Sequence, residues 1–214
     1  MSVGMKKSMS VIRLTVGLFA PLAAQGQGTI YLSNLGEPSA GSVATGNDAW
    51  IAKPFVTGNV SGAYELNSIQ LLMDNASGIP SDFAVSIYSS NLRQPATSLG
   101  NLSGPDPAAG GVFTYSTSGI TLSRFTLYFI VVTAATPVAN GSYNWSFANS
   151  ASYNSADQWL NFTYSYTSSD GSQWTRNDHP FQFAVYGTAV PEPATYALVG
   201  LGLACLRFWR RKTG

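Results

Sequence analysis

The sequence predicts an all-β fold, and three observations support this prediction. The chain is poor in charge, with 10% Asp, Glu, Lys and Arg, and it is rich in glycine and aromatic residues. Short apolar or aromatic runs alternate with clusters of turn-forming residues, a spacing typical of a sandwich or barrel. No long amphipathic helical pattern appears in the middle of the chain. We therefore expect a jelly-roll-like β-sandwich of about nine strands.

Two stretches show the strand pattern most clearly. Residues 181–185 alternate between apolar and polar or small side chains, which indicates a strand with one buried face. Residues 127–132 are apolar throughout, which predicts a central strand covered on both faces. The full set of predicted strands is 29–33, 49–56, 63–73, 83–89, 112–116, 126–133, 143–147, 159–166 and 181–186.

Four clusters of Gly, Pro, Asn, Asp and Ser are expected to form turns between these strands, because such residues have defined φ preferences or bond to their own backbone. The sequence shows no short-period repeat, which argues against a propeller or solenoid. The predicted turns are 74–78, 103–107, 139–141 and 169–171.

The 214 residues divide into one domain of ordinary size, expected at 27–189, and two terminal segments. The middle of the chain, from Gln25 to Pro191, holds four basic and nine acidic residues, and four minus nine gives a formal charge of −5. That sign excludes phosphate-backbone binding, so nucleic acid is not an expected partner. The single cysteine, Cys205, lies outside the domain, which rules out a domain disulfide and a thiolate metal site.

Residues 1–26 have the three parts of a signal peptide. Basic residues precede Arg13, an apolar run covers 14–22, and small residues follow at 23–26. Cleavage after Ala24 or after Gly26 fits, and signal peptidase is the expected enzyme. The alternative is an uncleaved membrane anchor, but the apolar run has about half of the ~20 residues that a span needs.

The last segment, 190–214, also has three parts. Its first part is Val190, Pro191, Glu192 and Pro193, whose prolines fix an extended backbone suited to a processing enzyme. Its last part is a basic end that stays on the cytoplasmic side by the positive-inside tendency, so the acidic domain is the part that crosses. The predicted membrane segment is Ala194, Thr195, Tyr196, Ala197, Leu198, Val199, Gly200, Leu201, Gly202, Leu203, Ala204, Cys205 and Leu206, and the basic anchor is Arg207, Arg210, Arg211 and Lys212.

We expect this membrane segment to form a short transmembrane-like helix. From Ala194 to Trp209 the chain has 16 residues. A helix of that length is about 24 Å long, somewhat less than the ~30 Å hydrocarbon core. An ordinary anchoring helix that follows a proline-rich linker is the alternative.

This tail resembles the PEP-CTERM sorting signal of Gram-negative bacteria. Pro191-Glu192-Pro193 matches the motif, Tyr196 takes an aromatic position, Gly200-Leu201-Gly202 lies in the helix, and Arg210-Arg211-Lys212 forms the basic end. The resemblance implies recognition by exosortase, a membrane transpeptidase-like enzyme. It further implies cleavage near the motif, then release or transfer to a cell-surface or exopolysaccharide layer.

The stretch 34–187 is similar to the extracellular β-domains called choice-of-anchor domains, of the R type. The similarity depends on short apolar and aromatic runs at 49–52, 55–58, 66–71, 83–88, 128–132 and 143–145. This family supplies no activity that transfers to a residue of the present chain.

Catalytic and metal-binding patterns are sparse. A Ser-His-Asp triad would have to use His179, the single histidine, with Asp178 as its neighbour, and the sequence has no nucleophile elbow. One histidine and one cysteine cannot supply a zinc site. We expect no metal and no cofactor, and we interpret the aspartates of the loops as solvated turn residues rather than as calcium ligands; they are Asp74, Asp82, Asp106 and Asp170.

Tryptophan is the residue type that most suggests a ligand, because exposed aromatic faces bind sugars. Core packing explains Trp50 and Trp145 equally well, so Trp159 and Trp174 are the candidate sugar contacts. The sequence thus predicts an exported, non-enzymatic surface or matrix protein whose partners are exosortase, the membrane and exopolysaccharide. The alternative is a carbohydrate-binding module acting on exopolysaccharide, and a secreted glycoside hydrolase ranks third.

Overall fold

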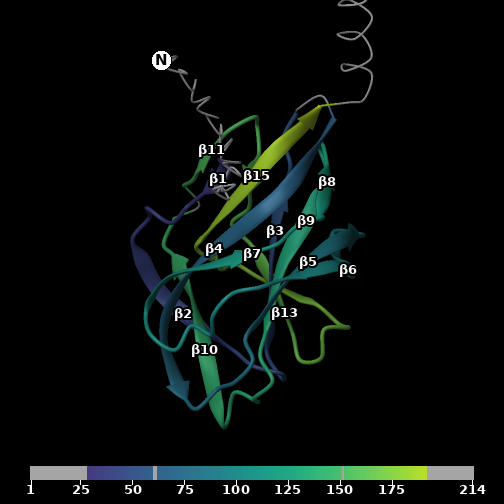
Figure 1. Ribbon diagram of the computed structural model, residues 1–214. Coiled ribbons are helices and arrows are strands. Elements are labelled where there is room, and N and C mark those ends of the chain that lie inside the picture. Colours follow the sequence, from purple (N-terminus) through teal and green to yellow (C-terminus); the bar gives the residue numbers. More distant parts are fainter. Residues whose placement is uncertain (1–27, 60–61, 151, 192–214) are drawn as a thin grey trace, which may run out of the picture.

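A computed structural model of the protein describes residues 28–59, 62–150 and 152–191. Two antiparallel sheets face each other in this part of the chain and form a sandwich, as Figure 1 shows. One sheet has eight strands and the other has seven. The all-β prediction and the two-sheet sandwich are confirmed, whereas jelly-roll connectivity stays a prediction.

The first sheet is built around its longest strand, β4. Its strands follow the order β11-β1-β15-β4-β10-β2, and β7 and β8 also pair with β4. Their bounds are β11 (Asn154–Ser155), β1 (Thr29–Ser33), β15 (Phe183–Pro191), β4 (Gly62–Gly78), β10 (Gly141–Ala148), β2 (Ser39–Thr45), β7 (Gly111–Ser116) and β8 (Thr121–Ser123).

The second sheet follows the order β14-β13-β3-β9-β5-β6, and β12 also pairs with β3. Its central strands, β3 and β9, carry most of its apolar side chains. The bounds are β14 (Thr175–Asn177), β13 (Ser165–Ser168), β3 (Trp50–Val56), β9 (Leu127–Thr133), β5 (Ala84–Asn91), β6 (Gln94–Leu102) and β12 (Leu160–Asn161).

Strand β4 has 17 residues and is shared by several partners along its length. On one side it pairs with β15, from Gly62 to Leu71. Farther along, Met73 pairs with Gly111 of β7 and with Trp145 of β10, so these two strands flank β4 on opposite sides. The length of β4 therefore determines how far the sandwich extends from one end to the other.

The hydrophobic core lies between the sheets and is rich in aromatic residues. Strand β9 lies at the centre of the second sheet, and its continuous apolar run covers both faces of that sheet. Ile130 and Val132 face the main core, whereas Phe129 and Val131 belong to a second cluster on the outer face of the same sheet. We call this second group the outer cluster, and its buried members are Ala52, Phe129, Val131, Tyr166 and Trp174. The prediction that 127–132 is buried on both faces is confirmed.

The predicted count of about nine strands is too low, because the described part of the chain contains fifteen. The additional strands are short, polar or both. Strand β2, for example, has the sequence SAGSVAT and pairs with β10 at the edge of the first sheet. An edge strand needs few apolar side chains, so its sequence lacks the pattern that reveals a buried strand.

One predicted turn is part of a strand in the structure, and one predicted strand is divided in two. The predicted turn at 74–78 is the end of β4, which continues because β10 pairs with it as far as Gly78. Asp74 contributes by accepting a hydrogen bond from the Ser146 hydroxyl of β10, at 3.0 Å. The predicted strand at 159–166 is instead two short strands, β12 and β13, with an interruption between them.

Candidate functional site

The last described strand, β15, presents the start of the proline-containing segment at one end of the sandwich. Val190 pairs with Ala63 and Pro191 pairs with Gly62 at the start of β4. On the other side, β1 reaches only as far as Gly187. The backbone of 188–191 is therefore extended and paired on one side only, a position in which strand proline is tolerated. Val190 is 40% exposed, so the beginning of the motif is accessible.

Both terminal segments of the chain connect to the domain at this same end. Thr29, at the start of β1, pairs with Gly187 near the end of β15. In Figure 1 the purple start of the described chain lies beside β15, whose yellow tip points to the top of the sandwich. The predicted signal peptide at 1–26 and the residues from Glu192 to Lys212 lie outside the described residues.

Trp159, which the sequence offered as a sugar contact, is in the core. Its indole ring stacks between Tyr31 at 5.1 Å and Phe55 at 5.7 Å, and Tyr64 meets it edge-on at 4.9 Å. Only 1% of its surface is exposed. The prediction for Trp159 is wrong, because both faces of the ring are covered by aromatic residues from the two sheets.

Trp174, the other candidate sugar contact, belongs to the outer cluster and is 8% exposed. It lies just before β14 and helps to cover the outer face of β3 and β9. Beside it, the Arg176 guanidinium lies 4.2 Å from the centre of the Tyr164 ring. The indole of Trp174 covers this apolar face of the sheet, and its role as a sugar contact stays a prediction.

Lys53 is a buried charged residue that the sequence did not single out. Its side chain is fully buried on β3, and its ammonium group donates hydrogen bonds to the carbonyl oxygens of Phe162 and Tyr164, the latter at 3.1 Å. Burial lowers the pKa of Lys53 from 10.5 to about 7. These two carbonyls belong to the interruption between β12 and β13, so the lysine holds the irregular segment against β3.

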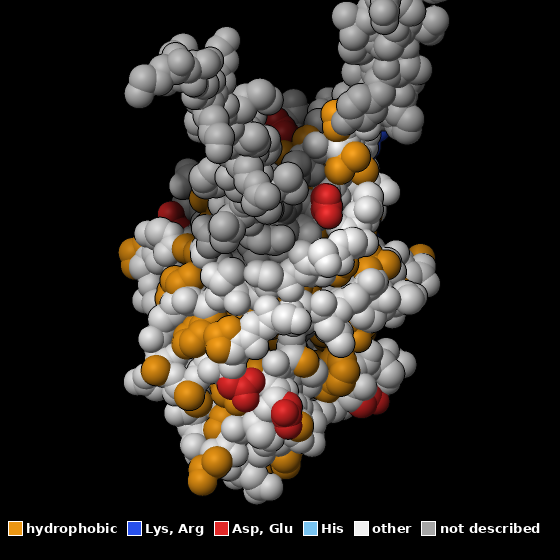
Figure 2. All heavy atoms as spheres, in the orientation of Figure 1, with side chains coloured by type: hydrophobic (Ala, Val, Ile, Leu, Met, Phe, Trp, Pro, Cys, Tyr) orange, Lys and Arg blue, Asp and Glu red, His pale blue; other side chains and the backbone are white. Residues whose placement is uncertain are grey.

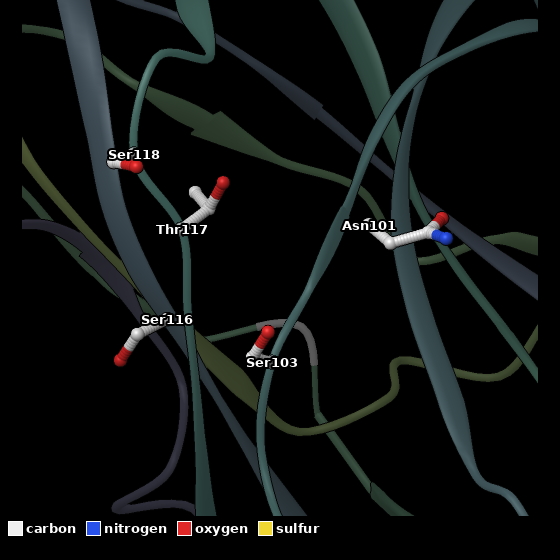
Figure 3. A pocket seen from close by; sticks show the side chains of 5 residues that line it. All are labelled: Asn101, Ser103, Ser116, Thr117 and Ser118. Atoms are coloured by element: carbon white, nitrogen blue, oxygen red, sulfur yellow. The ribbon is translucent and has the colours of Figure 1, made fainter.

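A polar hollow of about 440 Å³ lies where β6 and β7 end. Figure 3 shows its side chains on two neighbouring segments, with the Asn101 amide turned away from the residues of the other segment. That amide accepts a hydrogen bond from the Ser86 hydroxyl at 2.8 Å. The lining residues are Asn101, Ser103, Ser116, Thr117 and Ser118. Hydroxyl and amide groups can hydrogen-bond a ligand, but they supply no base to activate a nucleophile.

The single histidine does not face this hollow. The His179 ring packs 4.5 Å from the Phe147 ring and 5.9 Å from the Phe181 ring. Its neighbour Asp178 forms an exposed ion pair with Arg176 at 3.7 Å. The histidine is thus placed against aromatic residues before β15.

The aspartates of the loops accept hydrogen bonds from nearby and from distant segments of the chain. The Asp170 carboxylate accepts hydrogen bonds from the backbone and the hydroxyl of Ser172, both at 2.8 Å, and these bonds lower its pKa to about 2. Asp106 accepts from the backbone N–H of Phe83 at 3.0 Å and from the Tyr143 hydroxyl at 2.9 Å. Within the described residues, no three His, Cys, Asp or Glu side chains gather as a metal site would require.

Replacing Asp106 with alanine tests whether its two hydrogen bonds fix the loop before β7. We expect a loss of about 2 kcal/mol in the free energy of unfolding, because a buried tyrosine hydroxyl and a backbone N–H lose a charged acceptor. The matched control is Asp178→Ala, which removes an exposed carboxylate and is expected to cost less than about 0.5 kcal/mol. Urea unfolding of both variants measures their free energies of unfolding. Equal losses in the two variants would contradict the view that the Asp106 hydrogen bonds fix the loop.

Among the described residues, no helix has both the length and the apolar character required to cross a bilayer.

Comparison with known proteins identifies the tail but not the domain. No curated protein and no solved structure matches the chain. The similarity of the β-domain to choice-of-anchor domains stays a prediction. Residues 189–212 match the family described as the PEP-CTERM protein-sorting motif, which begins on β15 and implies export with a membrane-associated precursor in a Gram-negative bacterium.

Proposed function

We propose that this chain is a non-enzymatic protein of the cell surface or the extracellular matrix, delivered there through its C-terminal sorting signal. The observation that carries the proposal is the sorting motif at 189–212, which supports an exported protein sorted by exosortase. Signal peptidase removes the N-terminal segment, and exosortase processes the tail near Pro191-Glu192-Pro193. The β-sandwich is the part that is displayed.

The placement of the motif fits this route. Because β15 ends at Pro191 with an extended backbone, the strand leads the processing site away from the core. The fully buried residues of β15 lie six or more residues earlier, between Phe183 and Val185. A cut near the motif therefore leaves the packed part of the strand intact.

The proposal also includes association of the mature domain with exopolysaccharide. A surface made mainly of uncharged side chains supports it: Figure 2 shows a face that is mostly white and orange, with a few red carboxylates. Hydroxyl-lined hollows such as the one at Ser103 and Ser116 would contact sugar hydroxyls. A polysaccharide pull-down with the domain tests this part, and failure of every polysaccharide to retain the domain would contradict it.

Substitution of the motif tests the sorting route directly. In cells that contain exosortase, we expect mass spectrometry to find a mature chain that ends near the motif, in the surface or medium fraction. Pro191→Ala combined with Glu192→Ala is expected to leave the uncut chain in the membrane fraction, because the extended, charged recognition element is lost. In cells without exosortase, the unaltered chain should likewise stay uncut in the membrane fraction.

Glu65→Gln is the matched control, since it removes an exposed carboxylate of β4 outside the motif. This variant should be processed as efficiently as the unaltered chain. Identical chain ends in cells with and without exosortase would refute the sorting route.

A further inference from the structure

A turn next to the end of β15 holds a large apolar side chain in solvent. This turn, 124–126, connects β8 to β9. The preceding residue, Ser123, pairs with Ala63, and Ala63 pairs on its other side with Val190. Two strand spacings separate Ser123 from Val190, which is about 10 Å. The turn and the start of the sorting motif are therefore neighbours at the same end of the sandwich.

Hydrogen bonds fix this turn, so its exposed residues are not a loose loop. The backbone N–H of Phe125 donates to the carbonyl of Gly58 at 3.2 Å. The buried hydroxyl of Thr57 donates to Ser123 and accepts from the N–H of Thr126, at 2.6 and 3.0 Å. Phe125 has a φ of 49°, which is unfavourable for a bulky residue.

The side chains that the turn presents are an aromatic ring and a cation. Phe125 is 59% exposed, and Arg124 is also exposed. Arg124 has no ion pair among the described residues, whereas Arg176 is paired with Asp178.

The sequence after β15 indicates which surface this end of the domain faces. The apolar part of the sorting tail starts at Ala194, three residues after Pro191, and three extended residues span about 10 Å. Once the apolar part enters a bilayer, this end of the domain lies at the level of the lipid headgroups. Aromatic residues prefer that interface, and arginine pairs with phosphate through its planar fork.

We propose that the turn at 124–126 contacts the membrane in the precursor, with Phe125 in the interface and Arg124 on a lipid phosphate. This inference rests on the membrane-associated precursor of the proposed function. The contact orients the domain so that the start of the motif is held at a constant height above the bilayer. A lipid surface is favoured over a protein partner because the short connection already brings the turn to that surface.

The test uses the full chain, bound by its own tail to vesicles of phosphatidylethanolamine and phosphatidylglycerol. Cys205→Ser removes the native thiol, and Phe125→Cys then carries an environment-sensitive fluorescent label. Ile79→Cys is the matched control, since Ile79 is 89% exposed and follows the opposite end of β4. Arg124→Cys provides a second label position in case the first variant folds poorly. Nitroxide lipids and aqueous iodide serve as quenchers.

We expect nitroxide lipids to remove most of the emission at 125 and at 124, and to leave the label at 79 unchanged. Vesicle-bound chain whose labels at 125 and 79 respond alike to both quenchers would overturn the inference. A label at 125 that neither quencher reaches would also overturn it, in favour of a protein contact. Failure of the chain to float with the vesicles would instead contradict the membrane-associated precursor itself.

Discussion

Replacing Trp159 with alanine is expected to lower the free energy of unfolding of the domain by about 3 to 5 kcal/mol. The indole is stacked between Tyr31 of the first sheet and Phe55 of the second, with Tyr64 against its edge. Removing it leaves a cavity that joins both sheets, and rigid aromatic neighbours cannot fill that cavity. Urea unfolding followed by far-ultraviolet circular dichroism measures the loss without depending on the fluorescence of the removed residue.

Trp50 supplies the matched control for this experiment. It is only partly buried, beside the outer cluster, and its indole N–H donates to the carbonyl of Asn47 at 2.9 Å. Trp50→Ala is therefore expected to cost clearly less than Trp159→Ala. Trp159→Phe should fall between the two, because a phenyl ring keeps part of the stack. Equal costs at 50 and 159 would show that the stack does not stabilise the sandwich.

The buried lysine is expected to make the stability of the domain depend strongly on pH. The pKa of Lys53 is about 7 in the folded protein and 10.5 in the unfolded chain. Between these values the unfolded chain binds more protons, so stability rises with pH. From pH 7 to 9.5 we expect a gain on the order of 3 kcal/mol. Below pH 7 Lys53 is protonated in both the folded and the unfolded state, so it no longer makes the stability depend on pH.

Lys53→Met should remove this slope, because methionine fills a similar volume and carries no proton. Free energies of unfolding from urea titrations at several pH values give the comparison. The series stops at pH 9.5, since burial also raises the pKa of Tyr115 and Tyr143, and stability falls as the pH rises above 10. Arg176→Met removes an exposed cation and should leave the slope unchanged. A Lys53→Met variant with the slope of the unaltered domain would contradict this account.

Local sequence patterns predicted the buried strands well. The apolar run of β9 depends on both faces of that strand being covered, and this information is present in the sequence itself. The alternation at 181–185 predicted one buried face, whereas Gln182 and Ala184 are buried as fully as their apolar neighbours. The sorting tail was predicted for a similar reason, since its prolines, apolar run and basic end are consecutive. Such features require no knowledge of residues elsewhere in the chain.

Features that depend on distant residues were not predicted. The expected strand at 159–166 is interrupted because the ammonium group of Lys53 takes the carbonyls of Phe162 and Tyr164 that a ladder would otherwise use. The burial of Trp159 depends on Tyr31, more than a hundred residues earlier in the chain. The turn residues at 74–78 remain extended because β10 pairs with them. In each case a tertiary contact overrides the local preference.

Strand β15 also determines how the folded domain bears mechanical load. A pull on the carboxyl end of the chain acts along the axis of this strand. Its ladder hydrogen bonds are perpendicular to that axis, so the bonds to β4 and β1 are strained together in shear. Unfolding by such a force requires many bonds to break at once, together with the withdrawal of Phe183 and Val185 from the core. A domain held by this end in a flowing medium therefore resists extension.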